Sequence, residues 1–292
     1  MNCWVCPLWA DWDERDMNDK PQNEDRYTVP GLARGLQLLM QFNRDERELS
    51  GAELSRRMGL PRASVFRMLF TLEQSGFLER CPDGVSYKLG LAVLRLGFEL
   101  LASMELTEVG RPVIEALRDR SGFSAHVVVR DARDVVFIAK AAGSNAMFHS
   151  IQVGARLPAH ATVLGRTLMS DLDMKDLVAL YPEEVLPVYT PKTPTNLHDL
   201  KALMDQDRDK GYGVSMGGYE TGISTIAAPV FNEQGRVTAA ISISVPSQRI
   251  EDKALMPLVE MVRAAAAQMT ERLSHLPQRG GWPAKNKDKK AA

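Results

Sequence analysis

Residues 51–80 read GAELSRRMGLPRASVFRMLFTLEQSGFLER, and this stretch decides the architecture of the first part of the chain. Two short helical patterns flank a Gly-Leu-Pro turn, and five arginines stand against three glutamates. Ser50 precedes Glu53 by three residues, the spacing of a capping box at a helix start, and Gly59 is a residue type that commonly ends a helix. Two helices joined by so short a turn are either an ordinary buried pair or a helix-turn-helix.

The second helical pattern has an apolar face and an opposite face suited to DNA. Its apolar residues follow the spacing i, i+3, i+4, i+7, at Val65, Met68, Leu69 and Leu72, and Gly76 is expected to end the helix. The opposite side presents the predicted DNA contacts, which are Arg62, Ala63, Ser64, Phe66 and Arg67. In a major groove, arginine reads guanine, and small or apolar groups contact the thymine methyl. We therefore predict a recognition helix.

The flanking segments complete a small domain. A helix is predicted before the pair, because one helical face collects Leu32, Leu36, Leu39 and Met40. After Gly76, apolar residues alternate at Val85, Tyr87 and Leu89 beyond a Pro-Asp-Gly turn, which predicts a two-stranded wing. On its polar side, Arg80 and Lys88 are predicted to contact backbone phosphates. A winged helix that binds a protein partner would have the same pattern.

Three motifs in this order resemble the N-terminal DNA-binding domain of the IclR family of bacterial transcriptional regulators. They are LARGLQLLMQFN at 32–43, LSGAELSRRMGLPRASVFRMLFTLEQSGFLER at 49–80 and YKLGLAVLRLG at 87–97. The resemblance implies a winged helix-turn-helix over 29–89 that binds a double-stranded DNA operator. It also implies a homodimer or tetramer and allows RNA polymerase as a further partner.

Residues 90–106 are expected to form a linker helix. The stretch LGLAVLRLGFELLASMEL at 89–106 is apolar around most of a helix, so the helix must be covered on more than one side. A partner chain would provide that cover. In the IclR family the corresponding helix joins two protomers, which would pair two recognition helices with two half-sites.

Residues 107–275 predict an α+β domain with an antiparallel sheet. Hairpins are expected at 123–141 and 222–245, helices at 107–120, 160–170, 173–181 and 196–211, and a last helix from residue 252. This order resembles the GAF-like effector-binding domain of the IclR family, so the resemblance extends over residues 29–275. It implies a small organic acid as effector.

The resemblance also implies which residues line the effector site. They are Ala146, His149, Leu157, Val163, Leu164, Ser215, Ile223, Thr225, Ser242 and Ser244. The main-chain N–H groups of Val163 and Leu164 would lie near the ligand, since a free helix N-terminus binds carboxylates. Other interpretations stay open: Ser242 and Ser244 may equally face water, Thr225 may only favour the strand, and His160 may be structural.

The chain departs from the family pattern at two of these positions and at Gly218 nearby. Ser215 stands where an acidic residue is frequent, Gly218 where a glutamate is frequent, and Thr225 where a cysteine is frequent. Less negative charge and less bulk suggest a ligand larger than a two- or three-carbon acid, and an aromatic carboxylate is our hypothesis.

Other classes of function find little support in the sequence. It has no Gly-x-Ser-x-Gly, Walker or Gly-x-Gly-x-x-Gly motif, and its five histidines lack metal-ligand spacing, so we expect no catalytic residues, no metal and no cofactor. No apolar run reaches the roughly 18 residues of a membrane span, and three cysteines form no disulfide framework, which favours a cytoplasmic protein without a membrane partner.

The two ends of the chain are expected to be disordered. Residues 1–28 lack periodicity, and Met17 opens a sequence typical of a natural start, so residues 1–16 are expected to be an upstream extension. The Lys-rich stretch 276–292 is expected to be a basic tail.

Overall fold

The structure is a computed structural model that describes residues 28–43, 46–103, 105–143, 151–183, 185–246 and 250–274. The chain divides into two compact units at Leu100 and Leu101. The predicted basic tail, nearly all of the predicted N-terminal extension, and both Ala146 and His149 lie outside the described residues.

The first unit is the predicted winged helix-turn-helix. Its elements are α1 (Pro30–Leu39), β1 (Leu49–Ser50), α2 (Gly51–Met58), α3 (Arg62–Gln74), β2 (Leu78–Arg80) and β3 (Ser86–Leu89), and α4 (Leu91–Ser103) follows. The wing hairpin gains a strand that the sequence did not predict, because β1 pairs with β3 and the sheet order is β1-β3-β2. Gly76, at φ 74°, ends α3, and the Phe77 N–H donates to the Leu72 carbonyl.

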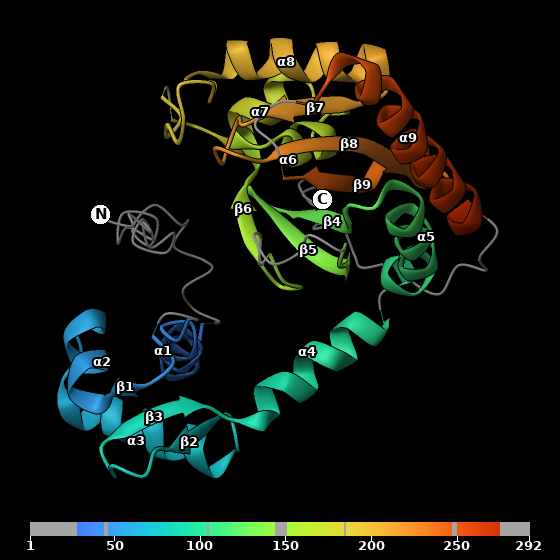
Figure 1. Cartoon of the computed structure of the whole chain (residues 1–292). Coiled ribbons are helices and arrows are strands. Elements are labelled where there is room, and N and C mark those ends of the chain that lie inside the picture. The colour runs from blue at the N-terminus through green and yellow to red at the C-terminus, as the bar shows by residue number, and fades with distance from the viewer. Residues whose placement is uncertain are drawn as a thin grey trace, which may run out of the picture. The chain divides into compact units, whose positions relative to one another are not determined.

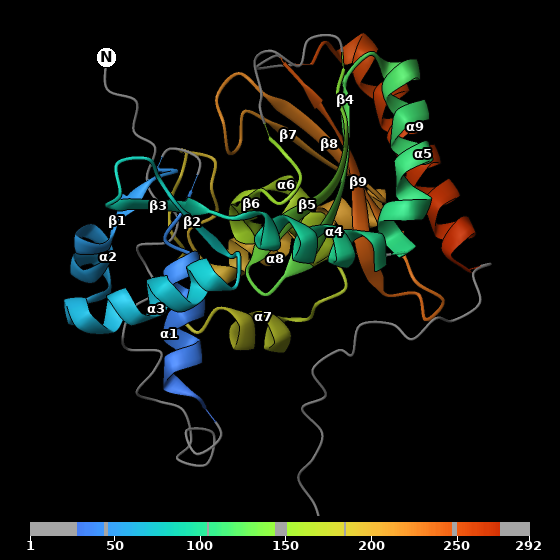
Figure 2. The same ribbon diagram turned by 90° about the horizontal axis from the view of Figure 1, so that it is seen from below.

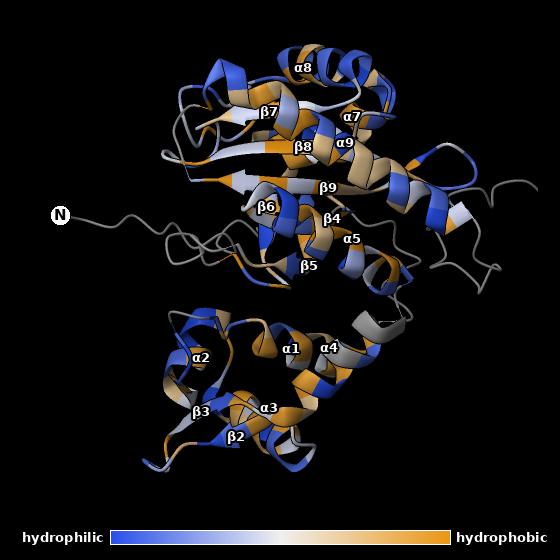
Figure 3. Ribbon diagram, turned by 45° about the vertical axis from the view of Figure 1, so that its right-hand side comes forward, coloured by the Kyte–Doolittle hydropathy of each residue, from blue (hydrophilic) through white to orange (hydrophobic). Residues whose placement is uncertain are grey.

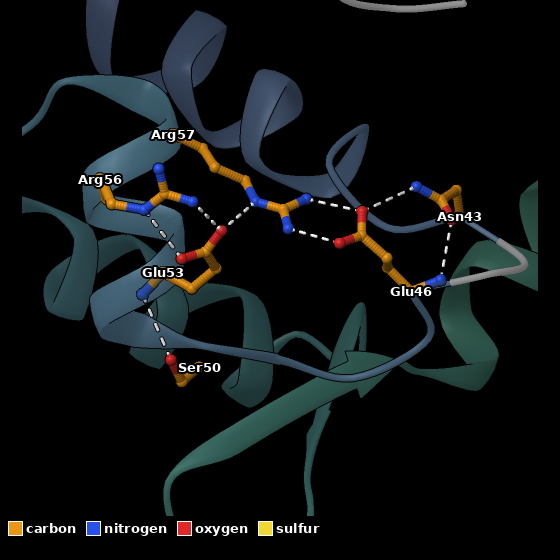
Figure 4. Close-up of polar contacts among 6 residues, drawn as sticks. All are labelled: Asn43, Glu46, Ser50, Glu53, Arg56 and Arg57. Atoms are coloured by element: carbon orange, nitrogen blue, oxygen red, sulfur yellow. Dashed lines mark hydrogen bonds and ion pairs between the residues drawn. The ribbon is translucent and has the colours of Figure 1, made fainter. Parts of the chain in front are cut away.

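The turn between α2 and α3 forms as the residue types dictate. Gly59 adopts the left-handed conformation (φ 61°) that ends α2, and α3 begins directly after Pro61. Ser50 Oγ accepts the N–H of Glu53 at 3.2 Å, but the predicted capping box is only half formed. The Glu53 carboxylate instead accepts hydrogen bonds from Arg56 and Arg57, and Arg57 also reaches Glu46 (Figure 4).

The first helix does not bury the face that its apolar spacing outlines. The core of the unit takes Leu38 from α1 and Phe42 beyond it, together with Leu54, Val65 and Leu69. Large parts of Leu32, Leu36 and Met40 are exposed instead. The predicted helix is present, but the spacing of apolar residues identifies a helix face and not what covers it, and the monomer leaves most of this face exposed.

The second unit has one antiparallel sheet, as predicted, and helices cover both of its faces. Its strands are β4 (Ser124–Asp131), β5 (Asp134–Ala141), β6 (Arg156–Pro158), β7 (Gly213–Met216), β8 (Ser224–Phe231) and β9 (Val237–Val245). Its helices are α5 (Glu105–Ser121), η4 (Ala159–Ala161), α6 (Val163–Leu168), α7 (Met174–Leu180), α8 (Leu197–Lys210) and α9 (Asp252–Ser274). The strand order is β6-β5-β4-β9-β8-β7, so the two predicted hairpins join through β4 and β9.

The two faces of this sheet carry different layers. On one face, α5 and α9 pack against β4, β5, β8 and β9, and on the other lie α6, α7 and α8 (Figures 1 and 2). Strand alternation sends Ala125 and Val127 toward α5 and α9, whereas Val128 joins the cluster around α6. Polar side chains of β4 and β9 on the α6 side therefore lie under a helical cover.

Candidate functional site

The outer face of α3 is open to solvent. Arg62, Ala63, Phe66 and Arg67 are exposed, Ser64 is half-buried, and Val65 and Leu69 anchor the opposite side in the core. Phe66 is 58% exposed, a large apolar surface to leave in water. Within the described part of the chain, the guanidinium groups of Arg62 and Arg67 form no hydrogen bond or ion pair, and the Arg67 carbonyl accepts the Thr71 hydroxyl. The face thus offers two available guanidinium groups beside apolar side chains.

The two cations predicted on the wing have carboxylate partners. The guanidinium of Arg80 bonds Glu73 of α3 at 3.1 Å and lies over the Tyr87 ring, 5.0 Å from its centroid. Lys88 Nζ lies 3.3 Å from Glu79 of the paired strand. Their contact with phosphates stays a prediction, and such contact would compete with these ion pairs.

The ribbon of α4 carries several hydrophobic residues, coloured orange in Figure 3. Leu91, Leu94, Leu96 and Leu100 are all exposed, and Leu94 is 52% exposed. Water-exposed leucines over three turns match the prediction of a helix that needs cover from a partner.

The second unit contains a cavity on the α6 side of its sheet. Of the residues predicted for the effector site, the structure brings seven to its wall: Leu157, Val163, Leu164, Ser215, Ile223, Thr225 and Ser244. These residues come from β6, α6, β7, β8, β9 and the turn before β8. The strand register brings the polar residues of the wall together. Ser244 of β9 pairs with Ser124 of β4 on one side and with Thr225 of β8 on the other.

The start of α6 forms one edge of the cavity. Thr162 Oγ1 accepts the N–H of Gly165 at 3.1 Å, and the Thr162 carbonyl accepts the N–H of Arg166. The N–H groups of Val163 and Leu164 form no hydrogen bond with any described residue. The helix comes close to η4 here, since a Cβ at Gly165 would overlap the backbone of Ala159. Two backbone donors are thus held at the cavity edge.

Sequence reasoning missed several wall residues. His126, Phe137, Thr162, Tyr219 and Glu220 also line the cavity. Burial lowers the pKa of His126 to about 4, with a smaller contribution from the nearby Lys140 charge, so its imidazole is neutral at pH 7. Burial likewise raises the pKa of Tyr219 to about 12. The sequence held one signal for His126. It stands two residues after Ser124 in β4, so both polar side chains lie on the same face of the strand.

Ser242 and His160 lie apart from the wall. Ser242 is fully buried beside His126 rather than exposed to the cavity, so its predicted place in the lining is wrong, although it faces the same side of the sheet as Ser244. His160 Nε2 bonds the Pro187 carbonyl at 2.9 Å, and its ring contacts Tyr181 and Tyr189. These contacts favour the structural interpretation of His160.

The residues with described placement contain no group of three or more His, Cys, Asp or Glu arranged to hold a metal ion. Among the same residues, every helix is too short or too polar to cross a membrane.

Family models match both units. The model for the IclR helix-turn-helix domain matches residues 31–82, and the model for the C-terminal domain of the bacterial transcriptional regulator IclR matches residues 98–271. The chain belongs to the IclR family. It is therefore a transcriptional regulator with a DNA-binding helix-turn-helix unit and an effector-binding unit.

Relatives support this membership along most of the chain. The transcriptional regulator XynR of Escherichia coli is 29% identical over 247 residues, which cover 85% of this chain and 98% of XynR. An IclR regulator from Alicyclobacillus acidocaldarius has a TM-score of 0.75 at 25% identity, covering 85% of this chain and 100% of that one. An IclR homologue from Microbacterium hydrocarbonoxydans was solved with 4-hydroxybenzoate. It has a TM-score of 0.72 at 28% identity, and the match covers 83% of this chain and 98% of the homologue.

Proposed function

We propose that this regulator binds a specific operator through α3 and responds to an aromatic carboxylate bound in the cavity of its second unit. The cavity carries the proposal. Its wall combines apolar side chains, neutral hydroxyl groups and the two backbone N–H donors at the start of α6. Among the described residues, Glu220 is the one charged side chain in the wall, so an anion would rely on neutral donors.

The departures from the family pattern support a ligand with a ring. Ser215 Oγ accepts the N–H of Gly218 at 3.2 Å, so these two neutral positions form one compact turn at the wall. A side chain at Gly218 would overlap Ser215 Oγ. The Microbacterium homologue was solved with an aromatic carboxylate, 4-hydroxybenzoate. Phe137 and Tyr219 offer this chain aromatic surface for such a ring.

The DNA contacts are proposed for Arg62, Ala63, Ser64, Phe66 and Arg67, with phosphate contacts from Arg80 and Lys88. Two exposed arginines without partners among the described residues, held on the face opposite the core, are what a recognition helix requires. The exposed apolar faces of α1 and α4 support a homodimer or tetramer, which would present two recognition helices to two half-sites in the cytoplasm.

Two measurements test this function. Isothermal calorimetry with benzoate, hydroxybenzoates, pyruvate and glyoxylate is expected to give the tightest binding for an aromatic acid. Tighter binding of glyoxylate or pyruvate would reject the aromatic effector. Operator affinity measured over a salt series is expected to fall steeply, because phosphate contacts release counterions. A flat salt dependence would favour a winged helix that binds a protein partner.

A further inference from the structure

Two buried polar atoms beside the cavity have no hydrogen-bond partner. They are Nδ1 of His126, whose side chain is 2% exposed, and Oγ of Ser242, which is 0% exposed. The two residues are register partners across β4 and β9, so their side chains lie next to each other on one face of the sheet. Folded proteins rarely leave such atoms unsatisfied, because burial removes their hydrogen bonds to water.

The histidine of this pair reaches the cavity wall. His126 lines the cavity, and its ring meets the Phe137 ring edge-on with centroids 5.3 Å apart. Ser244, two residues along β9 from Ser242, lines the same wall. A ligand seated against the sheet would therefore meet the His126 imidazole and the Ser244 hydroxyl, with Ser242 buried beside His126.

The charges around this pair favour a neutral ligand group. Lys140 is the β5 register partner of His126, but its Nζ donates to the Ile151 carbonyl at 2.7 Å and Lys140 is absent from the wall. Glu220 is the acidic residue of the wall. A neutral imidazole donates through one nitrogen and accepts through the other, and a serine hydroxyl does both. A ligand hydroxyl, which also donates and accepts, complements them.

We propose that His126, supported by Ser242, selects effectors that carry a hydroxyl group directed at the sheet, and so prefers hydroxylated aromatic acids to unsubstituted ones. This inference rests on the proposed aromatic effector. A site that hydrogen-bonds a hydroxyl rejects the analogue without it, because the buried protein groups then stay unpaired. The physical role of His126 is thus to read the ligand rather than to hold the fold.

Matched ligands and variants test the selection. Calorimetry would compare benzoate with 2-, 3- and 4-hydroxybenzoate on the wild-type protein, His126→Phe and Ser242→Ala. At least one hydroxybenzoate is expected to bind the wild type about tenfold or more tightly than benzoate. In His126→Phe the ratio of hydroxybenzoate affinity to benzoate affinity is expected to fall close to one. Ser242→Ala is expected to lower the ratio less.

Thermal unfolding without ligand gives an independent readout. His126→Phe and Ser242→Ala are expected to melt at or above the wild-type temperature, since each removes a buried atom that lacks a partner. His160→Phe is the matched control, because it loses the bond to Pro187. It is expected to melt at a lower temperature and to keep the wild-type preference for the hydroxylated acid.

The outcomes separate the two proposals. If none of the four acids binds the wild type, the aromatic effector is rejected, and the selection by His126 is rejected with it. If the acids bind but hydroxylation brings no gain, or the gain survives in His126→Phe, the selection alone is rejected. A lower unfolding temperature of ligand-free His126→Phe and Ser242→Ala would also reject it, because that result assigns the pair a structural role.

Discussion

Single residues set the chemistry of the exposed face of α3 and of the cavity wall in the second unit. On α3, the core contacts of Val65 and Leu69 leave Arg62 and Arg67 facing solvent. In the cavity, a neutral serine, a glycine and a threonine stand at positions where the family often has acids or a cysteine. Under the proposed function, a bound acid would rely on neutral donors in this wall, whose one charged side chain among the described residues is Glu220.

Arg67→Ala is expected to weaken specific operator binding by about 1–3 kcal/mol, the value of one arginine contact with guanine. Fluorescence anisotropy with labelled operator and with scrambled DNA would measure it. Arg56→Ala is the control, since Arg56 is exposed on α2 and already bonded to Glu53. Equal loss on operator and scrambled DNA would reassign Arg67 to a phosphate contact, and no loss on either would remove it from the interface.

A network of hydrogen bonds and ion pairs forms around the start of α2. Helix α2 begins at Ser50, and the Glu53 side chain that could complete the cap joins Arg56 and Arg57 instead. Arg57 is only 14% exposed on its side chain and bonds Glu46 through two nitrogens. The network ties the start of α2 to the segment that follows α1.

The Glu53 network predicts a pH dependence of stability. Hydrogen bonds from Arg56, and then Arg57, lower the pKa of Glu53 from 4.5 to about 2. Because the folded-state pKa is lowered, the stabilisation is complete above about pH 4.5 and is lost as the pH falls toward 2. Thermal melts should therefore show that Glu53→Gln lowers Tm by a few degrees at pH 7 and by less at pH 3.

Glu48→Gln, at an exposed acid outside this network, is the control and should change Tm little at either pH. A difference between wild type and Glu53→Gln that stays constant from pH 7 to pH 3 would contradict the assignment.

The leucines of α4 predict self-association. Leu94→Glu would bury a charge in an apolar contact between chains, so the dimer dissociation constant is expected to rise about a hundredfold or more. Sedimentation velocity over a range of concentrations would measure the shift. Arg95→Ala, on an exposed neighbouring position, should leave association near the wild-type level. A dimer of unchanged strength in Leu94→Glu would place the interface elsewhere.

The whole molecule must couple the cavity to DNA binding if the acid is a true effector. An acid that changes operator affinity by some factor must itself change affinity by the same factor when operator is bound, because linkage is reciprocal. Calorimetry of the tightest acid, with and without saturating operator, is expected to give the factor found in the DNA titration. An acid that binds equally well with and without operator, and so leaves operator affinity unchanged, would contradict its role as the effector.

Much of the fold was predictable because it rests on local spacing. The α2–α3 pair, the wing, both long hairpins and the helices of the second unit follow from apolar periodicity and from turn residues such as Gly59 and Gly76. Spacing also predicted the helix α1, but it did not show that the monomer leaves the apolar residues Leu32 and Leu36 exposed. A row of apolar residues shows that one face of a helix is hydrophobic. Only the packed structure shows whether another part of the same chain buries that face.

The sequence by itself determined most helices and hairpins, the family resemblance and, through that resemblance, seven cavity residues, because each depends on residues near one another in the chain or on matching motifs. Tertiary structure alone decided that β4 pairs with β9, which sets His126 of the cavity wall beside the buried Ser242. That pairing joins strands distant in sequence, and its register comes from the packing of α6 on one face and of α5 and α9 on the other. The unsatisfied atoms at the cavity are a product of that register.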